Sequence, residues 1–133
     1  MPTPESFFHV AVKTADLDAS VAFYREHLGA ELQSRVEGDG GGADDVSHAV
    51  LSVGDKRVYL FAEAPYEAAG LVEDVPPGFL HFGFVVDDVA AAHESLAAAG
   101  AEFIMEPTAF GSLKIAFFTD PDGTRIELIE ELD

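Results

Sequence analysis

Hydrophobic and polar side chains alternate over residues 8–12, close to the beginning of the sequence. Successive side chains of a β-strand point to opposite faces, so Phe8, Val10 and Val12 fall on one face and His9 falls on the other. The alternation therefore predicts a strand with one apolar face and a histidine on the opposite face.

The pattern then changes to helical spacing, with apolar residues at every third or fourth position between Leu17 and Leu28. Asp16 is a suitable N-cap for this helix, and Gly29 can adopt the left-handed conformation that ends many helices. Three strands follow, predicted at residues 31–37, 47–53 and 57–62. A flexible loop that contains Gly40-Gly41-Gly42 is predicted over residues 37–45, and a hairpin turn at Gly54-Asp55.

The same order of elements occurs a second time. Residues 80–84 align with residues 8–12, which places His81 on His9. A second helix is predicted between a cap at Asp88 or Asp87 and Gly100, followed by strands at residues 102–106, 114–119 and 125–129 and a turn at Asp120-Pro121-Asp122-Gly123. We therefore expect one α+β domain over residues 1–133, built from a module at 7–64, a linker at 65–78 and a module at 79–131.

Composition and charge narrow the functional classes. The 133 residues are 48% hydrophobic, enough for one compact domain, and 25 Asp and Glu outnumber 7 Lys and Arg to give a net charge of −18. This charge opposes binding to nucleic acids and anionic membranes. It favours a salt-adapted (halophilic) protein, because concentrated ions screen the repulsion between carboxylates; an acidic interaction surface is the alternative.

The chain has no Cys, which excludes disulfides and thiolate ligands, so any metal ion must be held by nitrogen and oxygen atoms. The first six residues have neither a basic start nor an apolar core, and no apolar run approaches the length needed to span a membrane. The sequence therefore predicts a cytoplasmic protein.

The alternation of side chains also places three possible metal ligands on strand faces that point away from the predicted helices. If Ile126 and Leu128 pack against the helix, Glu127 points to the opposite face, as His81 and His9 do on their own strands. Two imidazoles and one carboxylate match the 2-His-1-carboxylate set that binds divalent Zn, Ni, Mn, Co or Fe. The alternative is that these are ordinary strand histidines and a solvated carboxylate.

Four stretches of the sequence resemble the vicinal oxygen chelate superfamily, which includes glyoxalase I, the extradiol dioxygenases and the bleomycin resistance proteins. They are FHVAV at 8–12, AFYREHLG at 22–29, HFGFVVDD at 81–88 and DPDGTRIELIE at 120–130. The resemblance implies two βαβββ modules that form a curved mixed sheet around a concave site, usually in a homodimer. It also implies that His9, His81 and Glu127 bind one divalent metal ion.

One position departs from glyoxalase I, which has a second Glu on the last strand of the first module where this chain has Tyr59. Glyoxalase chemistry moves a proton between adjacent carbons through an enediolate-like intermediate, with a carboxylate as the base. A phenol, with a pKa near ~10, is a weaker base at neutral pH. Glu127, Tyr59 and His48, which is expected to open a strand, are therefore the candidate catalytic residues.

The favoured function is a metal-dependent, glyoxalase-I-like lyase or isomerase that acts on a small molecule with vicinal oxygens. An Fe(II) extradiol-type dioxygenase would use the same three ligands. A non-catalytic small-molecule binding or resistance protein is the third possibility. A strongly anionic substrate is disfavoured, because the only expected cations near the site are Lys13, Arg57, Lys114 and Arg125.

Overall fold

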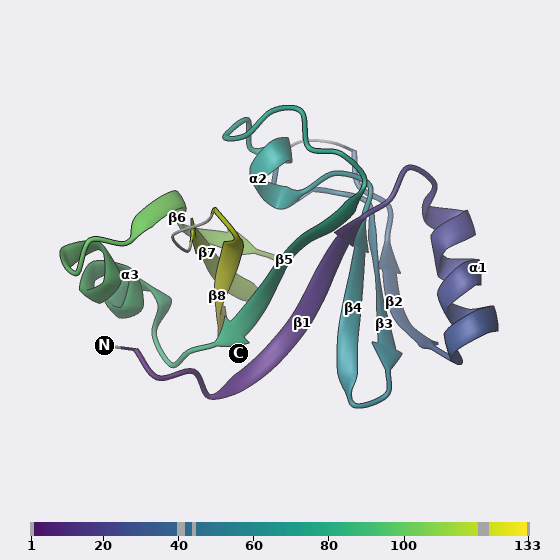
Figure 1. The fold of residues 1–133 in the computed structure, drawn as a ribbon, viewed down its shortest axis with the longest axis horizontal. Coiled ribbons are helices and arrows are strands. Elements are labelled where there is room, and N and C mark those ends of the chain that lie inside the picture. The colour runs from purple at the N-terminus through teal and green to yellow at the C-terminus, as the bar shows by residue number, and fades with distance from the viewer. Residues whose placement is uncertain (1, 40–41, 44, 120–122, 133) are drawn as a thin grey trace. The chain divides into compact units, whose positions relative to one another are not determined.

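The structure is a computed structural model, and it describes residues 2–39, 42–43, 45–119 and 123–132 (Figure 1). The chain divides into two compact units. The first unit comprises His9–Leu80, and the second unit comprises Met1–Phe8 together with His81–Asp133. Each unit contains one half of the repeated pattern of strands and helices.

The first unit contains β1 (Ser6–Lys13, which begins in the second unit), α1 (Leu17–Leu28), β2 (Glu31–Val36), β3 (His48–Val53), β4 (Lys56–Phe61) and α2 (Pro65–Ala68). Its strands follow the order β2-β3-β4-β1. The strand β1 is parallel to β4, whereas β3 is antiparallel to both β2 and β4. The pairing is therefore mixed.

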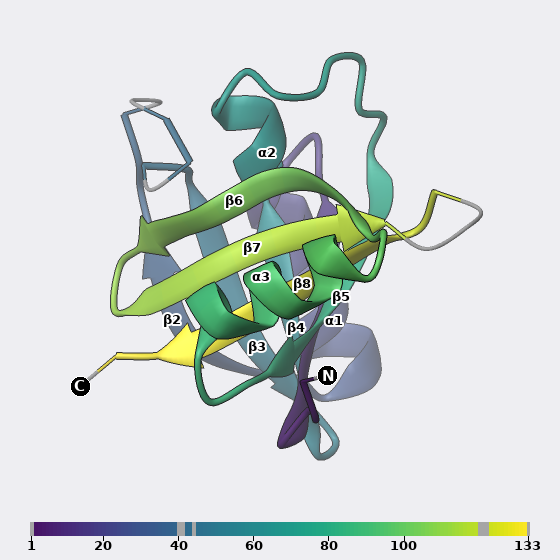
Figure 2. The ribbon, with the colours of Figure 1, turned by 90° about the vertical axis from the view of Figure 1, so that its left-hand side faces the viewer.

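The second unit repeats this plan with β5 (Gly78–Val85, which begins in the first unit), α3 (Val89–Ala98), β6 (Glu102–Phe110), β7 (Leu113–Thr119) and β8 (Arg125–Glu131). The strands follow the order β5-β8-β7-β6, with β5 parallel to β8 and the other pairs antiparallel. Figure 2 shows α3 against the strands of its own unit. The predicted fold class is confirmed: an α+β fold of two βαβββ modules with mixed strand pairing.

The helix boundaries follow from the capping residues that the sequence predicts. The Asp16 carboxylate accepts a hydrogen bond from the Ala19 backbone N–H at 3.0 Å, and Gly29 ends α1 with φ 64°. Of the two candidates for the second helix, Asp88 is the cap, accepting from the Ala91 N–H at 3.0 Å. Each helix therefore begins where a side-chain oxygen satisfies one of its first N–H groups.

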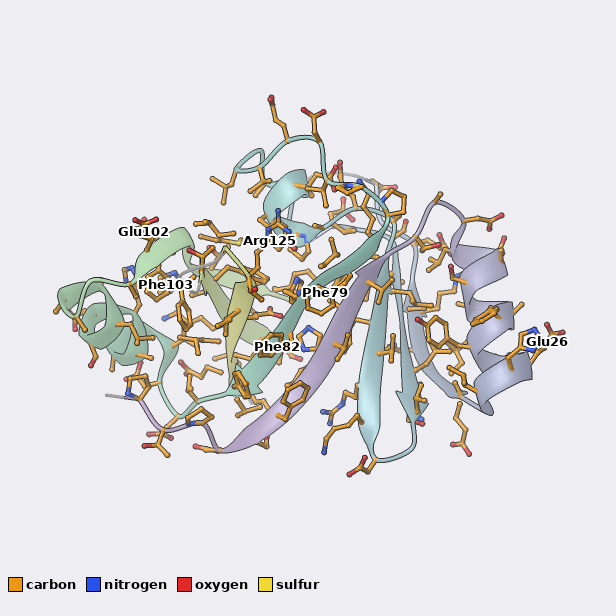
Figure 3. All side chains as sticks on the ribbon, viewed as in Figure 1. Glu26, Phe79, Phe82, Glu102, Phe103 and Arg125 are labelled. Carbon is orange, nitrogen blue, oxygen red and sulfur yellow. The ribbon has the colours of Figure 1, made fainter. Side chains whose placement is uncertain are left out.

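Each helix covers one face of the strands of its unit. The buried cluster of the first unit consists of Val21, Ala30, Ala49, Leu51 and Leu60. The corresponding cluster of the second unit consists of Val86, Val89, Ala92, Ala116 and Leu128. His93 on α3 contacts the Phe103 ring at a centroid distance of 4.5 Å, so it packs within this unit. Glu26 of the other unit projects outward from α1 (Figure 3).

Several boundaries differ from the prediction. The segment interpreted as a linker contains α2, whose Pro65 and Tyr66 are buried. The strands β6 and β8 continue past their predicted ends, to Phe110 and Glu131. The Gly54-Asp55 turn is present, with Gly54 at φ 62°. Gly40, Gly41 and Asp120-Pro121-Asp122, which carry much of the two predicted loops, lie outside the described residues.

No helix among the described residues combines the length and hydrophobicity needed to cross a bilayer.

Candidate functional site

The second unit brings together a buried histidine and a buried carboxylate. His81 on β5 is completely buried, Glu127 on β8 is 5% exposed, and the His81 Nε2 atom lies 3.1 Å from a Glu127 Oε1 atom. The parallel register pairs Gly83 with Glu127, so the alternation that places Gly83 on the face of His81 also places Glu127 there. The two side chains therefore meet although they are far apart in the sequence.

The surroundings of this pair are apolar. The Phe117 ring meets the His81 imidazole edge-on at 4.7 Å, Ile129 is buried on the same strand as Glu127, and Ile115 is buried on the neighbouring strand β7. A carboxylate in such surroundings requires a positive partner, either a protonated imidazole or a cation. One imidazole nitrogen and one carboxylate oxygen are suitable ligands for a divalent first-row metal ion, so the donor set fits the metal that the sequence predicts.

The first unit carries the third predicted ligand. His9 on β1 is 2% exposed, and its ring lies 4.6 Å from the ring of Tyr59 on β4. The register pairs Ala11 with Tyr59 in the same way that Gly83 pairs with Glu127 in the second unit. Tyr59 therefore occupies the position equivalent to Glu127.

His48 opens β3, as expected, and belongs to a group of rings in the first unit. Its imidazole is nearly parallel to the Tyr59 ring, at 6.3 Å and 5°, and lies 5.4 Å from Phe61. The Tyr59 and Phe61 rings are 5.9 Å apart. The His48 Nδ1 atom lies 2.7 Å from the Val46 carbonyl oxygen. His9, Tyr59 and His48 are thus connected through ring contacts within one unit.

Lys13, one of the cations expected near the site, forms an ion pair with Glu67. Its ammonium group donates to both carboxylate oxygens of Glu67, at 2.9 and 2.8 Å, and to the Val75 carbonyl at 2.6 Å. Both side chains are mostly buried, with 16% and 15% exposure. Glu67 thus neutralises the charge of Lys13, one of the four cations that the sequence predicts near the site.

Two of the surface hollows formed by described residues are lined by no candidate catalytic or metal-binding residue. One, of about 320 Å³, lies beside the N-terminus of α3 and is lined by Asp87, Asp88 and small residues. The other, of about 450 Å³, lies at the C-terminal end of α1 beside Arg25 and Glu26. Their linings bring together no set of groups suited to chemistry, so we assign no site to them.

Comparison with known proteins agrees with these features. The sequence profile of the Glyoxalase/Bleomycin resistance protein/Dioxygenase superfamily matches residues 6–128. The probable chloroplastic lactoylglutathione lyase of Arabidopsis thaliana is 34% identical over 124 residues, which is 92% of this chain and 35% of that protein. This chain thus spans about a third of the length of the plant protein.

Two further relatives match over most of their own length. The probable lactoylglutathione lyase of Vibrio parahaemolyticus is 32% identical over 124 residues, covering 92% of this chain and 88% of that protein. The crystal structure of methylmalonyl-CoA epimerase from Mycobacterium tuberculosis is similar with a TM-score of 0.77 and 26% identity, covering 98% of this chain and 90% of that one. The chain therefore belongs to the Glyoxalase/Bleomycin resistance protein/Dioxygenase superfamily.

Proposed function

We propose that this protein is a metal-dependent lyase or isomerase of the glyoxalase I type. Its substrate is a small molecule with oxygens on two adjacent carbons, such as the hemithioacetal formed by a 2-oxoaldehyde and a thiol. The observation that carries the proposal is the buried pair of His81 and Glu127, 3.1 Å apart in apolar surroundings. The similarity to the probable lactoylglutathione lyase of V. parahaemolyticus, over most of both chains, supports this class of reaction.

His9, His81 and Glu127 are the proposed ligands of one divalent ion, Zn, Ni, Mn, Co or Fe. All three are buried and carry atoms that are able to bind a metal. The histidines occupy equivalent strands of the repeat, which supports a shared role. When bound, such an ion would polarise the substrate oxygens and neutralise the negative charge that develops on them.

The remaining side chains determine the surroundings of the substrate. Phe61 is 2% exposed and Tyr59 is half-buried, and the two rings form an aromatic surface on one face of β4. In the second unit, the equivalent face of β8 carries Glu127. Apolar surroundings exclude water and strengthen the electrostatic interactions within the site. Lys13 is neutralised by Glu67, which favours a substrate with little negative charge.

One observation favours a second candidate, an Fe(II) extradiol-type dioxygenase. Tyr59 stands where glyoxalase I has a carboxylate, which leaves two imidazoles and one carboxylate as the proposed ligand set. This set is also the facial triad of non-haem iron oxygenases. Oxygen uptake by the Fe(II)-loaded protein with catechols would favour the dioxygenase, whereas the absence of oxygen uptake would exclude it.

We further propose that the protein is a cytoplasmic homodimer, that it is adapted to high salt, and that it binds no nucleic acid. Phe23 and Phe79 are 54% and 57% exposed, and a partner copy that covers such side chains would remove apolar surface from water. The net charge of −18 supports both salt adaptation and the absence of a nucleic-acid partner. A higher melting temperature in molar KCl than at low salt would support salt adaptation, and an equal or lower one would exclude it.

Elemental analysis of untagged protein tests the metal site, with wild type beside Glu127→Gln. We expect about one ion per chain in wild type and a strong loss in the variant, because the amide carries no charge. Glu102→Gln is the matched control, since Glu102 is exposed on β6 and lies outside the proposed site. Equal metal content in wild type and Glu127→Gln would exclude the site. Turnover of a 2-oxoaldehyde hemithioacetal by the metal-loaded wild type then tests the reaction.

A further inference from the structure

The first unit offers a group that can replace the carboxylate missing at position 59. On β1, β3 and β4, the side chains that share the face of Tyr59 include no Asp or Glu among the described residues. They are His9, Ala11, Lys13, His48, Val50, Ser52, Arg57 and Phe61. A proton transfer that relies on this face therefore needs a base other than a carboxylate of these strands.

His48 offers a basic side chain on this face. It lies on β3 opposite Phe61, one position along the same face from Tyr59, whose cross-strand partner is Val50. The rings of Tyr59 and Phe61, both on β4, lie 6.3 and 5.4 Å from its imidazole. The His48 side chain is half-buried, so it is oriented by packing and still accessible.

The hydrogen bond of His48 determines which ring nitrogen carries the proton. The Val46 carbonyl, 2.7 Å from Nδ1, can only accept a hydrogen bond, so Nδ1 is the donor. In the neutral imidazole, Nε2 then has no proton and presents its lone pair on the other side of the ring. An Nε2 lone pair directed away from the backbone is what a general base needs.

We propose that His48 is the residue that takes and returns the substrate proton, an inference that rests on the function proposed above. Nε2 accepts the proton from the hemithioacetal carbon as the C–H bond breaks. The electron pair forms a carbon–carbon double bond, and the carbonyl π pair moves onto the carbonyl oxygen. The imidazolium then returns the proton to the adjacent carbon, the hydroxyl proton passes to the newly charged oxygen, and no oxidant or further reactant is consumed.

Kinetics of metal-loaded variants test this role. In His48→Gln we expect kcat to fall by about a hundredfold or more, with KM little changed and wild-type metal content. In His48→Ala, added imidazole is expected to restore part of kcat. The matched control is His27→Gln, since His27 is an exposed histidine of the same unit on α1. Unchanged metal content distinguishes the role of His48 from that of Glu127.

A second measurement does not depend on activity. Nitrogen-15 NMR of the metal-free protein, above the pH at which histidines are charged, reports the tautomer of each imidazole. We expect a protonated Nδ1 and an unprotonated Nε2 for His48, and the reverse assignment would overturn the proposal. This measurement stands even if a His48 variant fails to fold.

The outcomes separate this inference from the function on which it rests. A wild type that is active and a His48→Gln variant with equal kcat would overturn the role of His48 and leave the glyoxalase-type reaction intact. A wild type that turns over no hemithioacetal in any of the five metal forms would overturn both. Loss of activity without rescue by imidazole in His48→Ala, together with the reversed tautomer, would assign His48 a structural role only.

Discussion

The two units are built on one plan but differ in the side chains on equivalent faces. In the second unit, His81 and Glu127 form a buried polar pair, whereas the equivalent positions of the first unit hold His9 and Tyr59, two rings 4.6 Å apart. Both positions are fixed by the same parallel register, Gly83 with Glu127 and Ala11 with Tyr59. The repeated backbone thus provides two equivalent places, and the side chains give one of them a carboxylate and the other an aromatic surface.

Exchanging the side chains at positions 59 and 127 is expected to have the largest effect, and the property that changes is the metal affinity. We expect Glu127→Tyr to lower metal affinity by more than a hundredfold, because it removes the only proposed carboxylate ligand. We expect Tyr59→Glu to raise metal affinity by about tenfold, because a second carboxylate adds charge and a ligand atom. Competition with a chelator of known affinity measures both changes, and Tyr59→Phe, which keeps the ring, is the control. A Tyr59→Glu protein with unchanged affinity would show that the two positions do not serve the same ion.

A second difference lies at the end of the strands, where Lys13 of β1 corresponds to the buried Val85 of β5. Lys13 is held by Glu67 and the Val75 carbonyl, which joins the chain segment after β4 to β1. We expect Lys13→Met to lower the free energy of unfolding by about 2 kcal/mol, because it leaves the Glu67 carboxylate mostly buried without a positive partner. Urea denaturation monitored by circular dichroism measures the change.

The double variant Lys13→Met with Glu67→Met replaces this ion pair by two apolar side chains. We expect it to regain most of the lost stability, since apolar residues of similar volume often replace a buried ion pair without loss. A double variant no more stable than Lys13→Met alone would contradict this account.

The sequence predicts the repeated features well, because they depend on local rules. Alternation in each strand places His81 and Glu127 on one face, and the caps at Asp16 and Asp88 follow from side chains that compete for the first N–H groups of a helix. The contact between Lys13 and Glu67 was missed, because its partners are separated by 54 residues and alternation says nothing about pairing over such a distance. The tautomer of His48 also depends on a distance, the 2.7 Å to the Val46 carbonyl, that no residue pattern contains.

The smallest expected difference concerns the helix caps. The first N–H of α3 donates to Glu130 Oε1 at 3.0 Å, in addition to the bond that Asp88 accepts. The residue of the first unit equivalent to Glu130 is Ala62, which has no oxygen in its side chain. We therefore expect Asp16→Ala to cost about 1 kcal/mol of unfolding free energy and Asp88→Ala to cost less.

Salt must be controlled in this last measurement, because removing any carboxylate from a chain of net charge −18 also relieves repulsion. At low salt, the weaker repulsion offsets part of the stability that is lost with the cap. At molar KCl the repulsion is screened, so the measured change is the loss of the cap alone. Urea denaturation in molar KCl should therefore separate the two variants more clearly than the same experiment in dilute buffer. Adding Glu130→Ala to Asp88→Ala should bring the loss up to that of Asp16→Ala. If Asp88→Ala alone is already as destabilising, Glu130 does not act as a second cap, and the two helices begin in energetically equivalent ways.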